Sequence, residues 1–74
     1  MFNTFYFQQM QDGTEARAMV TFESRDEAAS RFHMELAQVG ISSTLKKVSA
    51  MVFDDSGHIL MQAIEKKSAE EQSN

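Results

Sequence analysis

The sequence predicts an α+β fold, ββαββ, in which a four-stranded antiparallel sheet carries one helix packed on one face. Two turn signals of the same kind support this prediction, Gln11-Asp12-Gly13-Thr14 and Asp54-Asp55-Ser56-Gly57. Apolar runs with strand-like alternation flank each turn, and one amphipathic helix with a capping motif lies between the two hairpins. We expect a single domain over residues 1–65 and a disordered polar tail over residues 66–74.

The first hairpin is predicted from the alternation in residues 3–10 and 15–22. If Asp12-Gly13 is a two-residue type I′ loop, the pairs are Phe7 with Ala18, Phe5 with Val20 and Tyr6 with Met19. This register turns Phe5 and Phe7 toward the core. The outer face then carries Thr4, Tyr6, Gln8, Arg17, Met19 and Thr21. A slip of one residue would send Phe5 and Phe7 to the side of Arg17.

The helix is predicted over residues 25–39. Ser24 and Glu27 have the spacing of a capping box, in which each side chain accepts from the other residue's backbone amide. Apolar residues then recur at intervals of three and four: Ala29, Phe32, Leu36 and Val39. We expect Gly40 to end the helix.

The second hairpin is predicted over residues 45–53 and 58–65, with a type I turn that Gly57 closes in a left-handed bulge. In that register both faces are apolar. One face carries Val48, Val52, Leu60 and Ile64, and the other carries Met51, Phe53, Ile59 and Met61. A shorter or longer loop would redistribute the fourth strand between the faces, so its register stays open.

One helix covers only one face of a four-stranded sheet, so the second apolar face needs a partner unless the chain ends cover it. We therefore expect a non-enzymatic protein–protein interaction module that forms a homodimer. The predicted interface is Met51, Phe53, Ile59, Met61, Tyr6 and Met19.

Four lysines provide a second interpretation. Antiparallel pairing would bring Lys46, Lys47, Lys66 and Lys67 to one end of the second hairpin, where they could contact single-stranded nucleic acid beside Tyr6 or Phe53. Lysines at strand ends also serve solubility and discourage aggregation. The net charge of −4 argues against a duplex DNA binder held by phosphate contacts, but it does not exclude a local basic patch.

The motifs GxGxxG, GxxxxGK(S/T), HExxH and GxSxG do not occur in the sequence, and cysteine is absent. Asp54, Asp55 and His58 could suggest a metal site, but aspartate and glycine in this order are what a tight turn requires. We expect no enzymatic activity, no cofactor and no metal. Apolar stretches are only a few residues long and the first residues do not resemble a signal peptide, so a cytoplasmic protein without membrane contact is expected.

Several segments resemble small uncharacterised proteins of phages and mobile elements from gut Firmicutes. These are Phe5-Tyr6-Phe7, Asp12-Gly13-Thr14-Glu15-Ala16, Val20-Thr21-Phe22, Asp26-Glu27-Ala28, Phe32-His33-Met34-Glu35-Leu36 and Val52-Phe53-Asp54-Asp55-Ser56-Gly57. The resemblance implies a phage or mobile-element accessory protein and carries over no site residues. With the negative charge, it raises a third hypothesis, an acidic inhibitor of a host defence protein that mimics nucleic acid. Clustering of Glu23, Asp26, Glu27 and Glu35 on one surface would support that hypothesis.

Overall fold

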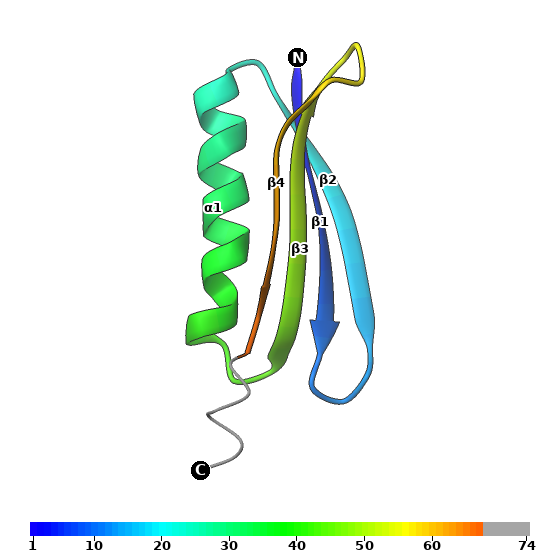
Figure 1. Ribbon diagram of the computed structural model, residues 1–74, viewed down its shortest axis with the longest axis vertical. Coiled ribbons are helices and arrows are strands. Elements are labelled where there is room, and N and C mark those ends of the chain that lie inside the picture. Colours follow the sequence, from blue (N-terminus) through cyan, green and yellow to red (C-terminus); the bar gives the residue numbers. More distant parts are fainter. Residues whose placement is uncertain (68–74) are drawn as a thin grey trace.

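The structure, a computed structural model, describes residues 1–67 and confirms the predicted ββαββ fold. Its elements are β1 (Phe2–Met10), β2 (Glu15–Phe22), α1 (Arg25–Ile41), β3 (Leu45–Asp54) and β4 (Ile59–Lys66). The strands form one antiparallel sheet in the order β2-β1-β3-β4, and α1 covers one face of it (Figure 1). The fourth strand extends to Lys66, and most of the expected tail, residues 68–74, lies outside the described residues.

The first hairpin closes through a three-residue loop. The Met10 amide donates to the Thr14 carbonyl at 2.8 Å, and the Gly13 amide donates to the Met10 carbonyl at 3.1 Å. Gly13 has a φ of 94°, a left-handed backbone that side chains with a Cβ disfavour. The predicted two-residue loop is therefore wrong by one residue.

This longer loop shifts the whole register of the hairpin. The observed pairs are Phe5 with Met19, Tyr6 with Ala18 and Phe7 with Arg17. Because side chains alternate between faces, the shift turns Phe5 and Phe7 away from the helix and turns Tyr6 toward it. The predicted orientation of these three aromatic side chains is reversed in the structure.

The second turn is of the predicted kind. The Asp54 amide donates to the His58 carbonyl and the Gly57 amide donates to the Asp54 carbonyl, both at 3.0 Å. Gly57 has a φ of 90°, so the left-handed glycine is confirmed. The two turns therefore share one backbone design.

A bulge follows this turn and settles the register of β4. The ladder pairs Phe53 with Ile59 but Val52 with Met61, which leaves Leu60 as the extra residue. The consequence is that Met61 lies on the helix side of the sheet, where it packs against the core. Ile64 lies on the opposite side and is 62% exposed.

The helix begins as predicted and ends later. The Ser24 hydroxyl accepts from the amides of Asp26 at 3.1 Å and Glu27 at 3.3 Å, which confirms the Ser24 half of the predicted capping box. The helix continues through Gly40 instead of ending there. Its C-terminal cap is Ser42, whose amide donates to the Gln38 carbonyl, so a left-handed glycine is not used at this end.

The core lies between α1 and the facing side of the sheet. Its buried members are Ala28, Phe32, Val39, Leu45, Val48, Ala50 and Val52. Thr4 is also fully buried there, and its hydroxyl donates to the Ala28 carbonyl at 2.8 Å. This bond ties the central strand β1 to the first turns of the helix.

The three glycines allow a test of this backbone. Gly57→Ala should lower the free energy of unfolding by about 1–2 kcal/mol because alanine is strained at positive φ, and Gly13→Ala should do the same. Gly40→Ala should raise it by about 0.5–1 kcal/mol, because this position is helical and a Cβ there has no atom within 4 Å. Urea denaturation at one fixed protein concentration measures all three. A destabilising Gly40→Ala or neutral turn variants would contradict the assigned backbone.

Candidate functional site

The face of the sheet that points away from α1 is the candidate site, and we name it the open face. Strand alternation and register place sixteen residues on it in four rows. From the β3–β4 turn downward the rows are Thr21, Asn3, Phe53, Ile59; Met19, Phe5, Met51, Gln62; Arg17, Phe7, Ser49, Ile64; and Glu15, Gln9, Lys47, Lys66. Within the described residues no helix or strand covers this face (Figure 1).

Apolar side chains occupy the first three rows of the open face and come from all four strands. We name them the apolar patch: Phe5, Phe7, Met19, Met51, Phe53, Ile59 and Ile64. Met19 and Ile59 are each 55% exposed. Ile64 is exposed as well. The neighbouring side chains in the sheet half-bury the other four members, Phe5, Phe7, Met51 and Phe53. A continuous apolar surface of this kind makes the open face a candidate interaction site.

A shallow hollow lies within the apolar patch, between β1, β3 and β4. It measures about 460 Å³ and is lined by Phe5, Ser49, Ala50, Met51, Gln62, Ala63 and Ile64. Ser49, the small open-face residue between the larger Phe7 and Ile64, leaves this space. We name it the Ser49 hollow.

Positive charge gathers at one end of the open face. The Arg17 guanidinium carbon lies 5.4 Å from the centre of the Phe7 ring, in the range of a cation–π contact. Lys47 and Lys66 pair across β3 and β4 in the last row. Glu15 is the one acidic residue among these rows, so this basic end is net positive in a chain of net charge −4.

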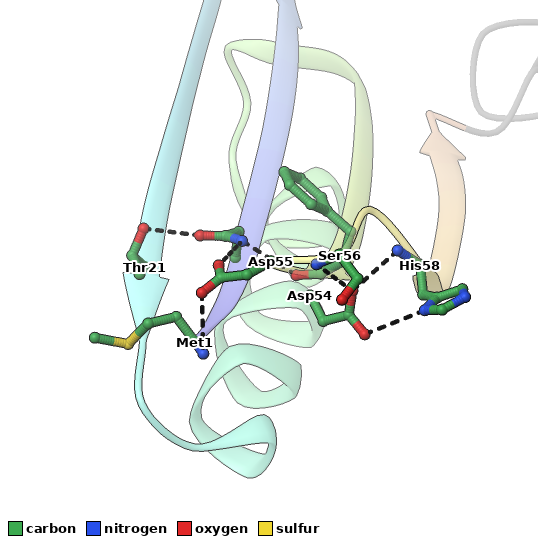
Figure 2. A network of polar contacts seen from close by, with 8 residues as sticks. Met1, Thr21, Asp54, Asp55, Ser56 and His58 are labelled. Carbon is green, nitrogen blue, oxygen red and sulfur yellow. Dashed lines mark hydrogen bonds and ion pairs between the residues drawn. The ribbon is translucent and has the colours of Figure 1, made fainter.

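A polar network closes the other end of the open face (Figure 2). Asn3 donates to the Phe53 carbonyl and to the Asp55 carboxylate, each at 3.3 Å, and its own oxygen accepts from the Thr21 hydroxyl at 2.9 Å. The Met1 amine lies 3.3 Å from the other Asp55 oxygen. Asn3 is 7% exposed because these groups cover it. The network places Asp55 over the open-face end of β1 and links three strands there.

Asp54 supplies the second carboxylate of this turn. One of its oxygens accepts from the Ser56 amide at 2.9 Å and the His58 amide at 3.0 Å (Figure 2). The His58 amide bond, followed by the Ser56 amide and the nearby imidazole, lowers the pKa of Asp54 below its ordinary value. The Asp54 carboxylate therefore stabilises the turn by accepting hydrogen bonds from two of its backbone amides. We name Asp54 and Asp55 together the acidic turn.

The predicted interface residues fall on both sides of the sheet. Met19, Met51, Phe53 and Ile59 lie on the open face. Tyr6 and Met61 do not, because the loop length and the bulge turn both of them toward α1, where they pack against the core.

Sequence reasoning missed Phe5, Phe7 and Ile64 as open-face residues. The pattern of β1 allows either face to be the inner one, since Tyr6 alternates with two phenylalanines. The inner face of β1 depends on the length of the loop that contains Gly13. The sequence does not specify this length, because Asp12-Gly13 suits both a two-residue and a three-residue loop. The open face is therefore apolar across both hairpins and not only across the second.

Tyr6 belongs instead to a polar network between the sheet and the helix. Its hydroxyl accepts from Arg31 at 3.2 Å, and the Arg31 guanidinium pairs with Glu35 at 2.8 Å. Gln8 donates to the second Glu35 oxygen at 3.1 Å. The Glu35 carboxylate, and then the Tyr6 hydroxyl, raise the pKa of Arg31 above its ordinary value. Glu35 is 6% exposed and fully partnered, which indicates a structural role.

This burial bears on the acidic-inhibitor hypothesis. Glu23, Asp26 and Glu27 are exposed around the start of α1, whereas Glu35 is withdrawn beneath Arg31. The four residues do not form one acidic surface, which counts against nucleic-acid mimicry.

The four lysines do meet at one end of the second hairpin. Lys47 pairs with Lys66 in the ladder, and the Lys67 amide donates to the Lys46 carbonyl at 2.9 Å. Of these, Lys47 and Lys66 take open-face positions, next to Phe7 and Ile64 in the preceding row. Tyr6 and Phe53, expected beside the lysines, lie elsewhere: Tyr6 faces the helix and Phe53 stands at the opposite end of β3.

Comparison with known proteins finds no matching family model, no matching curated protein and no matching solved structure. Within residues 1–67, the helix α1 is not long and apolar enough to cross a membrane. Over the same residues, histidine and acidic side chains nowhere gather in a group of three that could hold a metal ion.

The acidic turn allows a test by pH. A carboxylate with a lowered folded-state pKa stabilises the fold at neutral pH, and this contribution disappears as the pH falls from 3.8 through the folded-state pKa. Asp54→Asn keeps an acceptor oxygen but removes the charge, so its free energy of unfolding should vary less between pH 5 and pH 2 than that of the parent. Ser56→Ala is the control, because Ser56 contributes its backbone amide. An unchanged pH dependence in Asp54→Asn would refute the assigned role.

Proposed function

We propose that this protein is a non-enzymatic protein–protein interaction module that self-associates as a homodimer through the open face. The observation that carries the proposal is the apolar patch, which extends over all four strands on the side of the sheet opposite α1. At one margin of the patch, Asn3 and Thr21 already have hydrogen-bond partners within the chain. Burial of that margin does not leave these polar groups unpaired.

The energetics favour association through this face. Removing apolar surface from water contributes about 25 cal/mol per Å², so covering even 200 Å² contributes roughly 5 kcal/mol. A domain this small has a total stability of that order. A second copy is always present at the concentration of the protein itself, which makes it the simplest partner.

Single-stranded nucleic acid is a second candidate for the same face. The observation that favours it is the proximity of the Phe7 ring, stacked under Arg17, to Lys47 and Lys66 on a net positive end of the sheet. Aromatic platforms with flanking cations are typical of single-strand binders. If this function holds, a fluorescent oligonucleotide should bind with an affinity that falls steeply with salt, and Lys47→Ala with Lys66→Ala should reduce that slope. Absence of binding at low salt would exclude it.

The chain offers a matched pair of methionines to test the homodimer. Met19 is 55% exposed on the open face, and Met34 is 48% exposed on α1. Met19→Glu should weaken self-association by tenfold or more, about 1.4 kcal/mol, because it places an unpaired charge in the interface. Met34→Glu should leave it unchanged.

Sedimentation equilibrium over micromolar to high micromolar protein measures both variants against the parent. A parent chain that stays monomeric throughout would overturn the homodimer. Equal weakening by the two variants would move the interface away from the open face.

A further inference from the structure

We propose that the two copies stack open face to open face in an antiparallel orientation, so that the basic end of each copy meets the acidic turn of the other. This inference rests on the proposed homodimer and adds its geometry. Two identical sheets that pack with nearly aligned strands can be related by a two-fold axis along the strands or across them. An axis along the strands brings like ends together, and an axis across them brings opposite ends together.

The area of the open face suits a second copy. Four strands spaced ~4.8 Å apart and about eight residues long give a face of roughly 19 by 26 Å, or about 500 Å² for each copy. Both copies together would bury about 1,000 Å², which is the lower bound for a specific interface. The partner must therefore cover all four rows of the open face. A dimer that leaves the end rows uncovered would bury less area than a specific interface needs.

Charge separates the two orientations. The basic end carries Arg17, Lys47 and Lys66 against one acid, Glu15, whereas the acidic turn carries Asp54 and Asp55 against one cation, the Met1 amine beside Asp55. An axis along the strands would gather six cations and two acids at one end of the dimer. An axis across the strands, passing through the row of Met51, carries Lys47 to the partner's Asp55. Opposite potentials then meet at both ends of the interface.

Shape agrees with the antiparallel orientation. With the axis through the row of Met51, Phe53 of each copy lies over the partner's Ser49, where the Ser49 hollow can receive its ring. Ile59 then faces the partner's Ile64 on the β4 strands. In the parallel orientation Phe7 would have to fill the hollow, but the Phe7 ring is already covered by Arg17.

The β2 strands are the weakest part of this arrangement. Arg17 there lies over the partner's Thr21, and Glu15 approaches the partner's Glu23 at the rim. Both acids are exposed, so water and salt screen their repulsion. The interface is therefore centred on β1, β3 and β4.

Cross-linking through single introduced cysteines tests the orientation, since the described chain and the whole sequence contain no cysteine. Met19 on β2 and Gln62 on β4 are both exposed and share one row with Met51. In the antiparallel dimer each of these residues lies opposite the same residue of the partner, across a sheet spacing of ~10 Å. Met19→Cys and Gln62→Cys should therefore each form a covalent dimer with a short bifunctional thiol reagent, and Met34→Cys on α1 should not.

The other arrangements give different patterns. A parallel stack brings β2 over the partner's β4, so neither variant would cross-link alone but a mixture of the two would give a mixed dimer. Side-by-side pairing of edge strands could link at most one of the two variants. Either pattern overturns the antiparallel stack while the homodimer stands. Absence of every cross-link together with a monomeric sedimentation profile would overturn the homodimer as well.

A charge reversal provides the second, independent measurement. Lys47→Glu should raise the dimer dissociation constant roughly threefold or more, because it loses the partner's Asp55, as expected for an exposed ion pair. In a parallel stack the same change would relieve repulsion and tighten the dimer. Arg25→Glu is the control, since it changes the net charge equally at the exposed start of α1. Tightening by Lys47→Glu, or equal weakening by Arg25→Glu, would contradict the proposed orientation.

Discussion

The left-handed backbone at Gly13 is the constraint on which the rest of the structure depends. It lets the first hairpin close through three residues, and the closing pair of Met10 and Thr14 then fixes every pair along β1 and β2. β1 is a central strand that also pairs with β3. The alternation of β1 therefore also determines which β3 side chains share a face of the sheet with Phe5 and Phe7. One backbone conformation in a surface turn thereby determines which aromatic side chains enter the core and which remain outside it.

The core accepts this register because polar residues of β1 find partners on the helix side. Thr4 donates to a helix carbonyl, Tyr6 accepts from Arg31, and Gln8 donates to Glu35. These bonds satisfy groups that would otherwise be costly to bury. The apolar Phe5 and Phe7 take the outer positions in exchange. On β1, the side facing the helix is therefore rich in hydrogen bonds and the outer side carries large apolar side chains. This arrangement is the physical basis for the proposed partner.

Much of the fold could be predicted from local signals. The two turns, the Ser24 cap and the strand-like alternation specify the order of elements, because each signal acts within a few residues. The faces could not be predicted equally well. Asp12-Gly13 fits two loop lengths, and the bulge that makes Leu60 the extra residue leaves no mark in the sequence. Each ambiguity of one residue exchanges the two faces of a strand, so the candidate site was more uncertain than the fold.

The apolar open face depends most on the register of the first hairpin. Nuclear Overhauser effects from the Met19 methyl group measure this register directly, because the methyl group reports which aromatic ring of β1 lies beside it. The structure requires contacts with the Phe5 ring. Contacts with the Tyr6 ring instead would mean that Phe5 and Phe7 face the helix, and the apolar open face would not exist in this form.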